Sequence, residues 1–220
     1  MRTGFHTDLD QLTADLGAMC ELATHVMASS TAALVDARQR SADPTNADLA
    51  RLDQLDARVS DRAFVLLALQ SPVARDLRLV VSAIQIAAGA HRMGGLAANV
   101  GKVAHRHHQN PVLPAAALNH FAAMGRVAVE LAGDVTTAVV TCDAALAQRI
   151  QDDDAMDALH RQLFALVTDR RWTHGVAAAT DAILLGRFYG RFADHAIEIA
   201  RRVVFQATGH VPATLDLASH

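Results

Sequence analysis

The amino-acid sequence predicts an all-α protein in which six long helices form two repeated antiparallel three-helix bundles of spectrin-like type. Three observations predict this fold: an excess of alanine, prolines that bound long segments, and a repeat at a constant offset. The 220 residues are 51% hydrophobic but only 4% aromatic, and 45 of them are alanine. Alanine has the lowest cost of any residue in a helix and is depleted in strands. A disordered chain is not this apolar, so we expect closely packed helices.

The five prolines stand where helices can end: Pro44, Pro72, Pro111, Pro114 and Pro212. Proline lacks the amide donor and clashes with the preceding turn, so the proline-free segments between these points predict helices. The last segment, 115–211, is too long for one helix in a compact domain. Turn-forming residues at 141–143 and 169–175 predict two breaks in it, which gives six helices.

Apolar spacing supports the helices in turn. In the first segment the apolar residues recur at alternating intervals of three and four: Leu9, Leu12, Leu16, Met19, Ala23 and Val26. The segment after Pro114 repeats the pattern with Phe121, Met124, Ala128, Leu131, Val135 and Ala138, and the next helix has Met156, Leu159, Leu163 and Leu166. This period is typical of helices that turn one face to a bundle core.

The third and sixth predicted helices carry seams that match at a constant offset of 99 residues. The seams are Val80, Ile84, Ala87, His91, Gly94, Ala98 and Gly101, and Ile183, Gly186, Gly190, Ala193, Ile197, Ala200 and Val204. Ile84/Ile183 and Arg92/Arg191 are identical pairs, and upstream Leu55-Asp56 matches Met156-Asp157 at an offset of 101. We interpret this as a duplicated three-helix unit. The expected units are 1–110 and 111–212, with 213–220 as a C-terminal tail.

Charge and hydropathy exclude several classes of protein. A net charge of −3 and a pI near 6.4 argue against nucleic-acid binding. The N-terminus has acids before any apolar run, which does not fit a secretory signal, and the most apolar stretch, Val80 to Ala90, is too short to span a membrane. We therefore expect a cytoplasmic protein. Cys20 and Cys142 lack metal or redox spacing, and each is expected to be a buried free thiol.

No catalytic constellation stands out, because the chain has no Gly-rich phosphate loop, G-x-S-x-G elbow or Ser/His/Asp grouping to argue from. We expect no enzymatic activity. The acidic run is the most suggestive cluster: Asp152, Asp153, Asp154 and Asp157. Asp153 and Asp157 are four apart, so on a helix they share a face and can hold a hard cation. Acids near a helix N-terminus also cap the first turn, and capping is the simpler interpretation.

Histidines and arginines leave similar alternatives open. His105, His107 and His108 crowd a predicted helix end, where solvation and the dipole explain them as well as a metal does. His91 lies on the predicted inner seam, as a hydrogen-bonded core residue or as a ligand. Arginines of the sixth helix fit a solvated face or an acidic partner surface.

Two segments resemble the PhoU family of accessory regulators of high-affinity phosphate transport. The first is LALQSPVARDLR at Leu67 to Arg78, followed by the long helix to Ala104, and the second is RFADHAIEIA at Arg191 to Ala200. The resemblance spans essentially the whole chain, and its second half is most similar to the actinobacterial branch. It implies two three-helix bundles without catalytic residues.

The resemblance also implies a function. Members restrain the phosphate-starvation response by contacting the ATPase of the phosphate ABC transporter and a sensor histidine kinase, so we expect a negative regulator that is peripheral to the membrane through its partners only. Candidate partner-binding residues are Arg78, Arg92, Arg187 and Arg191. Two alternatives stay open, a metal-binding helical bundle and an accessory protein of a low-affinity phosphate permease.

The family's acid-x-x-x-Asp metal motifs are degenerate in this chain. The first repeat has His91 and Gly95 at the acidic positions of its third helix, and the second has Gly190 before Asp194. With Asp153 and Asp157, the second repeat keeps three candidate metal ligands. We expect no cofactor, with one weakly bound iron or zinc in the second repeat as the alternative.

A homodimer is a further expectation. The sixth helix carries a second apolar set besides its inner seam: Leu185, Phe192, Ala196, Ile199 and Val203. One three-helix unit does not cover both faces, which favours association with a second chain.

Overall fold

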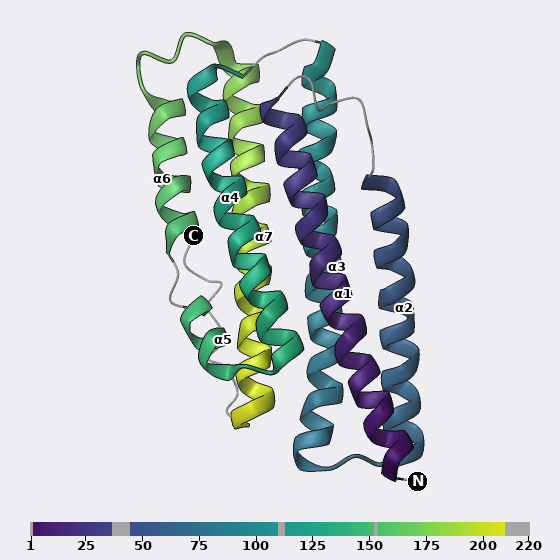
Figure 1. The fold of residues 1–220 in the computed structure, drawn as a ribbon. Helices are drawn as coiled ribbons and strands as arrows, with labels where there is room; N and C mark the ends of the chain where they lie inside the picture. Colours follow the sequence, from purple (N-terminus) through teal and green to yellow (C-terminus); the bar gives the residue numbers. More distant parts are fainter. Residues whose placement is uncertain (1, 37–44, 110–112, 152–153, 210–220) are drawn as a thin grey trace.

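The computed structural model describes residues 2–36, 45–109, 113–151 and 154–209, which are all helices and short connections (Figure 1). The helices are α1 (Arg2–Val35), α2 (Thr45–Gln70), α3 (Ala74–Gln109), α4 (Ala115–Thr141), α5 (Ala144–Gln151), α6 (Ala155–Thr168) and α7 (Gly175–Thr208). The all-α prediction is confirmed. The expected fifth helix is in two pieces, α5 and α6. The tail predicted at 213–220 lies outside the described residues.

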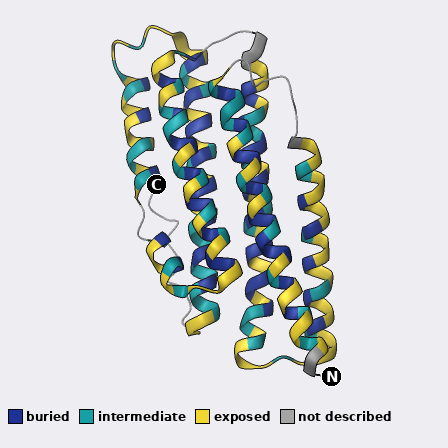
Figure 2. Ribbon diagram, in the orientation of Figure 1, coloured by how far each residue is buried: buried dark blue, intermediate teal, exposed yellow. Residues whose placement is uncertain are grey.

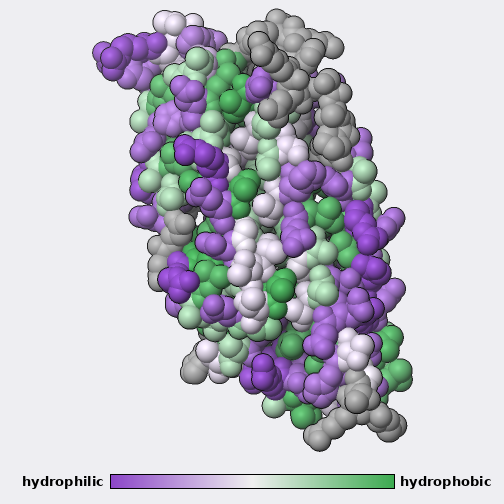
Figure 3. All heavy atoms as spheres, viewed as in Figure 1, coloured by the Kyte–Doolittle hydropathy of each residue, from purple (hydrophilic) through white to green (hydrophobic). Residues whose placement is uncertain are grey.

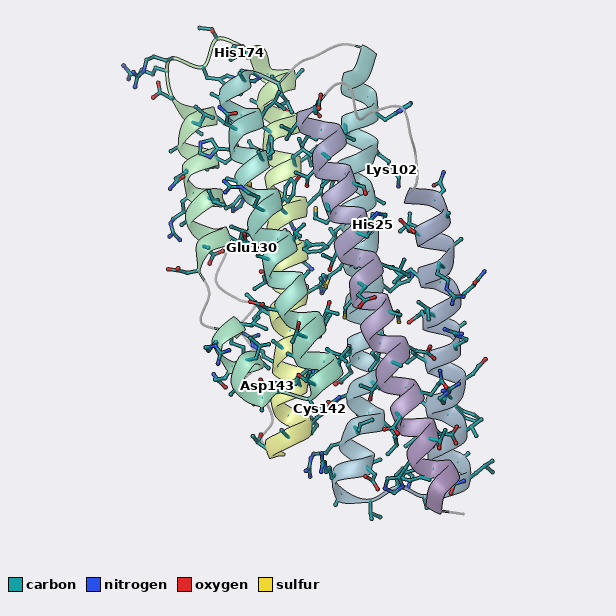
Figure 4. All side chains as sticks on the ribbon, viewed as in Figure 1. His25, Lys102, Glu130, Cys142, Asp143 and His174 are labelled. Carbon is teal, nitrogen blue, oxygen red and sulfur yellow. The ribbon has the colours of Figure 1, made fainter. Side chains whose placement is uncertain are left out.

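Both predicted breaks in the long C-terminal segment occur where the turn residues stand. α4 ends at Thr141, and Cys142 follows it in the left-handed region at φ 53°. Cys142 is exposed because it stands in this turn, so the expectation of a buried thiol is wrong here, whereas Cys20 is buried. The Asp143 carboxylate then accepts hydrogen bonds from the amides of Ala145 and Leu146, both at 2.9 Å, and so caps α5. Figure 4 shows Cys142 and Asp143 together at this turn. The second break separates α6 from α7 at Asp169 to His174.

Four helices form the centre of the molecule. α1 packs on α3 and α4, and α7 packs on the same two helices from the opposite corner. α2 lies against α1 and α3, while α5 and α6 lie against α4 and α7. The molecule therefore has two broad faces, one of α1 and α4, in front in Figure 1, and one of α3 and α7 behind them.

The core is continuous across both predicted units and is lined by the inward sides of the central helices (Figure 2). The seams expected on α1 and α4 are buried throughout, which confirms those predictions. Tyr189 is fully buried, stacks on Phe121 with ring centroids 6.0 Å apart, and shares a 2.8 Å hydrogen bond with the Thr31 hydroxyl. Tyr189 and Thr31 come from different halves of the chain, so the two bundles share one interior.

The seams predicted for α3 and α7 are partly wrong. Ile84 and Ile183 are 40% and 43% exposed, and the His91 side chain is 45% exposed. The residues expected to face a second chain are instead buried: Leu185, Phe192, Ala196, Ile199 and Val203. The reason is that α3 packs along α7 within the chain and covers them. The argument for a homodimer from this apolar set is therefore lost.

One described helix, α1, is long and apolar enough over Gly4–Val35 to cross a membrane by length and composition. Its apolar side chains lie in the core here, with Leu12, Met19 and Met27 fully buried. Core helices pass the same test, so this property is weak evidence for a membrane span.

Candidate functional site

The acidic motif positions of the second half lie where α6 packs on α7. Asp157 is in the first turn of α6, and Asp194 is near the middle of α7. Partial burial raises the pKa of Asp194, and the nearby Asp157 carboxylate raises it further, whereas Arg191, His160 and Arg201 lower it. Two carboxylates from different helices therefore act on one another across this contact.

Two glycines of α7 shape this contact in different ways. A Cβ on Gly186 would lie 2.7 Å from Leu163 Cδ2 and 3.2 Å from His160 Cδ2, so a glycine here allows α6 to approach closely. A Cβ on Gly190 would meet no atom within 4 Å. The position at which the acidic motif lacks its carboxylate is therefore open, and a longer side chain would fit there.

The donor set of these helices does not fit a multinuclear metal cluster. No group of three His, Cys, Asp or Glu side chains within metal-binding reach exists among the described residues. The Arg191 guanidinium lies 3.9 Å from the Asp194 carboxylate, so a cation there already competes for it. Asp153 lies outside the described residues. Asp154 is the N-cap residue of α6 but its side chain makes no capping hydrogen bond, so the capping interpretation of the acidic run is not supported at Asp154.

The corresponding contact of the first half, α2 on α3, is built differently. His91 Nε2 lies 2.7 Å from Asp53 Oδ1, so the predicted core histidine is a half-exposed partner of a carboxylate on α2. Leu52 is buried, and its Cδ2 would lie 2.3 Å from a Cβ on Gly94, so a leucine and a glycine form the close contact. A Cβ on Gly95 would meet nothing within 4 Å.

Two of the four candidate partner-binding arginines, Arg92 on α3 and Arg191 on α7, both act on the charge of His195 on α7. Burial lowers the pKa of His195, and the positive charges of Arg191 and Arg92 lower it further, while Glu198 opposes them. Arg92 therefore lies near enough to His195 to act on its charge across the helix pair. On the same helix Glu198 pairs with Arg201 at 3.4 Å and with Arg202.

The other two arginines lie apart from this centre. Arg187 is exposed one turn before Arg191 on α7. Arg78, near the start of α3, lies against the last residues of α7: a Cβ on Gly209 would be 3.4 Å from its guanidinium carbon. Its Nε is buried with no hydrogen-bond partner among the described atoms. A cation beside a helix C-terminus is favourable, so Arg78 stabilises the end of α7.

The sequence predictions missed two features of this region. One is His195, which sequence spacing does not single out, because its half-buried position follows from the packing of α7. The predicted seams put Ile84 and Ile183 inside because their spacing is helical, but spacing alone does not say which neighbour covers a face. The histidines at the end of α3 do not decide between a solvated helix end and a metal site. His105 is exposed, and the side chains of His107 and His108 are not described.

The chain matches the family described as "PhoU domain" twice, over residues 16–104 and 121–203. It is 52% identical over 213 residues to the phosphate-specific transport system accessory protein PhoU homolog 2 of Mycobacterium tuberculosis, covering 96% of this chain and all of that one. PhoU homolog 1 of the same organism is 43% identical and matches at full length on both sides. The relative from Rhizobium meliloti is 28% identical, covering 96% and 90% of the two chains.

Solved structures show the same fold. The crystal structure of PhoU from Pseudomonas aeruginosa superposes with a TM-score of 0.84 at 21% identity, covering 94% of this chain and all of the other. The phosphate transport system regulatory protein PhoU from Streptococcus pneumoniae gives a TM-score of 0.82 at 21% identity, covering 94% and 98%. Both confirm the paired three-helix bundles.

Proposed function

Because the chain belongs to the PhoU family, we propose that it is a cytoplasmic, non-catalytic adaptor that restrains phosphate uptake and phosphate-starvation signalling. As an accessory protein of the phosphate transport system, it would contact the ATPase subunit of the phosphate ABC transporter and a sensor histidine kinase. Its position at the membrane would come from these partners.

The observation that carries the proposal is the 52% identity over the whole length of an accessory protein of phosphate-specific transport. The physical character of the chain supports it. Long helices with solvent-facing sides suit a protein that docks on other proteins and shifts their conformational equilibrium. The sequence also offers no nucleophile and base at catalytic spacing.

A deletion strain and a binding assay test the proposal together. Loss of the gene should raise expression of phosphate-starvation genes in phosphate-rich medium, and the wild-type chain should restore repression. The purified chain should bind the transporter ATPase, the cytoplasmic part of the kinase, or both. Normal repression in the deletion strain, together with no binding to either protein, would refute the adaptor.

A metal-binding role is the second candidate, favoured by the Asp157 and Asp194 carboxylates that act on one another across α6 and α7. A bound cation would neutralise both charges. Elemental analysis of chain purified without chelator checks this role: it predicts iron or zinc that disappears in Asp157→Asn and Asp194→Asn but persists in Asp53→Asn, the matched change in the first half. Protein without stoichiometric metal would remove this candidate.

A further inference from the structure

The exposed surface of α3 and α7 combines apolar and cationic side chains in a pattern that occurs twice. On α3 the exposed residues Leu77 and Ile84 precede Arg92, and on α7 the exposed residues Val176 and Ile183 precede Arg191. The residues of α7 follow those of α3 at the offset of 99 that relates the two halves: Leu77 corresponds to Val176, Ile84 to Ile183 and Arg92 to Arg191. The duplicated unit has therefore kept an exposed isoleucine and an exposed arginine at equivalent positions, while neighbouring exposed positions have diverged, as at Ala88 and Arg187.

The two copies of this pattern are related by an approximate two-fold axis. Gly89 packs beside Ile199, and Arg78 packs beside Gly209, so the residue numbers run in opposite directions along the two helices. Antiparallel helices whose sequences match at a constant offset are exchanged by a half-turn about an axis through their midpoint. That midpoint lies near Gly94 and Ala193, close to the Arg92, Arg191 and His195 group.

The surface is also the basic side of an acidic protein. α3 and α7 together carry nine Lys and Arg against four Asp and Glu, whereas α1 and α4 carry two against six. Toward the top of α3 the exposed Lys102 continues the cationic side, and its equivalent on α7 is Arg201 (Figure 4). The opposite face, of α1 and α4, mixes hydrophilic and apolar residues (Figure 3). A chain with net charge −3 thus concentrates positive charge on the two helices that form this face.

We propose that the α3/α7 face docks onto a two-fold-symmetric protein dimer whose surface is acidic around an apolar contact. Each protomer of that dimer would receive one isoleucine and one arginine of this chain, so one chain would bind per dimer. A second copy of this chain does not fit, because two basic faces would repel one another. The inference rests on the proposed function, since it describes the partner surface of the adaptor.

Calorimetric titration of the full-length chain with the purified transporter ATPase, and separately with the dimeric cytoplasmic part of the sensor kinase, tests the proposal. We expect one chain per partner dimer and an affinity that falls with salt. Arg92→Glu and Arg191→Glu should each weaken binding by about tenfold, because the two positions are equivalent, and the double variant should weaken it further than either single variant. Arg126→Glu, an exposed arginine on α4, is the matched control and should leave the affinity unchanged.

The apolar residues give an independent arm. Ile84→Ser and Ile183→Ser should weaken binding similarly to one another, while Val140→Ser, which is 52% exposed on α4, should not. Circular dichroism of every variant checks that the helices are intact.

The outcomes separate the two proposals. Wild-type binding that is unaffected by the arginine and isoleucine variants, or a stoichiometry of two chains per dimer, overturns the docking face and leaves the adaptor standing. No binding to either protein overturns the docking face, and it overturns the adaptor as well if the deletion strain shows normal repression. Binding to phosphatidylglycerol vesicles that the arginine variants abolish, without binding to either dimer, would assign the face to a membrane and refute a protein partner.

Discussion

The two halves of the molecule use their charged side chains for different purposes. In the first half, opposite charges join neighbouring helices: Arg58 pairs with Asp15 at 2.8 Å, and His91 pairs with Asp53 at 2.7 Å. His25 on α1, directed toward α2 in Figure 4, lies 2.9 Å from Asp48. All three pairs hold α2 to α1 or α3. In this half, ion pairs between helices therefore help to hold α2 against α1 and α3.

In the second half, the ion pairs of α7 lie within the helix itself, as in Arg191 with Asp194 and Arg201 with Glu198. Across α6 and α7 the like charges of Asp157 and Asp194 act on one another instead. Apolar contacts such as Gly186 with Leu163 hold α6 in place. Duplication therefore preserved the helix packing while the polar positions of the two copies diverged.

The interior differs as well, and the largest predicted effect comes from that difference. Tyr189 is fully buried in the second half, whereas its equivalent at the offset of 99 is Ala90. Tyr189→Ala should lower the free energy of unfolding by about 3–5 kcal/mol, because it removes a large buried side chain and leaves a cavity. Urea denaturation followed by circular dichroism measures this loss.

Tyr189→Phe separates packing from hydrogen bonding. It keeps the ring and removes only the hydroxyl that meets Thr31, so we expect a loss of about 1 kcal/mol. A Tyr189→Phe variant as unstable as Tyr189→Ala would show that the hydrogen bond, and not the filled volume, joins the two halves.

The ion pairs of α2 give the next largest effect. The Asp15 side chain is only 7% exposed and its Oδ2 has no hydrogen-bond partner among the described atoms, so Arg58 is its main counter-charge. Arg58→Ala should cost about 1–3 kcal/mol, because it leaves a buried carboxylate unpaired. The same change at the exposed Arg126 should be nearly neutral. If Asp15→Ala with Arg58→Ala is no more stable than Arg58→Ala alone, the unpaired charge is not the cause.

The sequence predicted the fold because its signals are local. Proline positions and turn residues at 141–143 and 169–175 depend only on the chain itself, and so do the seams of α1 and α4. The third and sixth helices failed in part because each also carries large apolar side chains on its exposed side, such as Ile84 and Ile183, and spacing alone does not distinguish these from core residues. The predicted seam of the third helix puts Ile84 in the bundle core, whereas its exposed fraction is 40%.

The site was harder to predict than the fold. The repeat showed that His91, Gly95 and Gly190 replace acidic positions, but not that His91 would find Asp53 on α2. Pairing across helices depends on their relative rotation and height, which a match between two sequence segments does not specify. Likewise, the grouping of Arg92 with His195 follows from the antiparallel crossing of α3 and α7, and no spacing within either helix encodes it.

Alanine substitution at two neighbouring glycines of α3 should change stability in opposite directions, by less than the changes at Tyr189 and Arg58. Gly95 is exposed with open space around it, so Gly95→Ala should raise stability by about 0.5–1 kcal/mol through helix propensity. Gly94→Ala would place a Cβ 2.3 Å from the buried Leu52, and overpacking should reverse that gain. Thermal melts of the two variants check the sign. Equal stabilisation by both would show that Leu52 moves aside freely and that Gly94 is not needed for close approach.

The smallest effects concern the two carboxylates Asp194 and Asp53. Removing the charge of each should change the free energy of unfolding in opposite directions. The raised pKa of Asp194 means that the folded state binds its proton more tightly than the unfolded state does, so its contribution to stability is lost as pH rises through that pKa. At pH 7, Asp194→Asn should therefore be more stable than wild type. The gain should stay below about 1 kcal/mol because the carboxylate is exposed, and it should shrink as pH falls toward 4.

Asp53→Asn should instead be less stable than wild type at pH 6. It removes the charged partner of His91, so the free energy of unfolding should fall by up to about 1 kcal/mol. Measuring both variants against wild type by urea denaturation from pH 4 to pH 8 makes the comparison direct. Destabilisation by Asp194→Asn at pH 7 would mean that its pairing with Arg191 outweighs both its burial and its repulsion from Asp157. A charged Asp194 would then stabilise the second half, as a charged Asp53 stabilises the first. The two halves would not differ in how these two carboxylates act on stability.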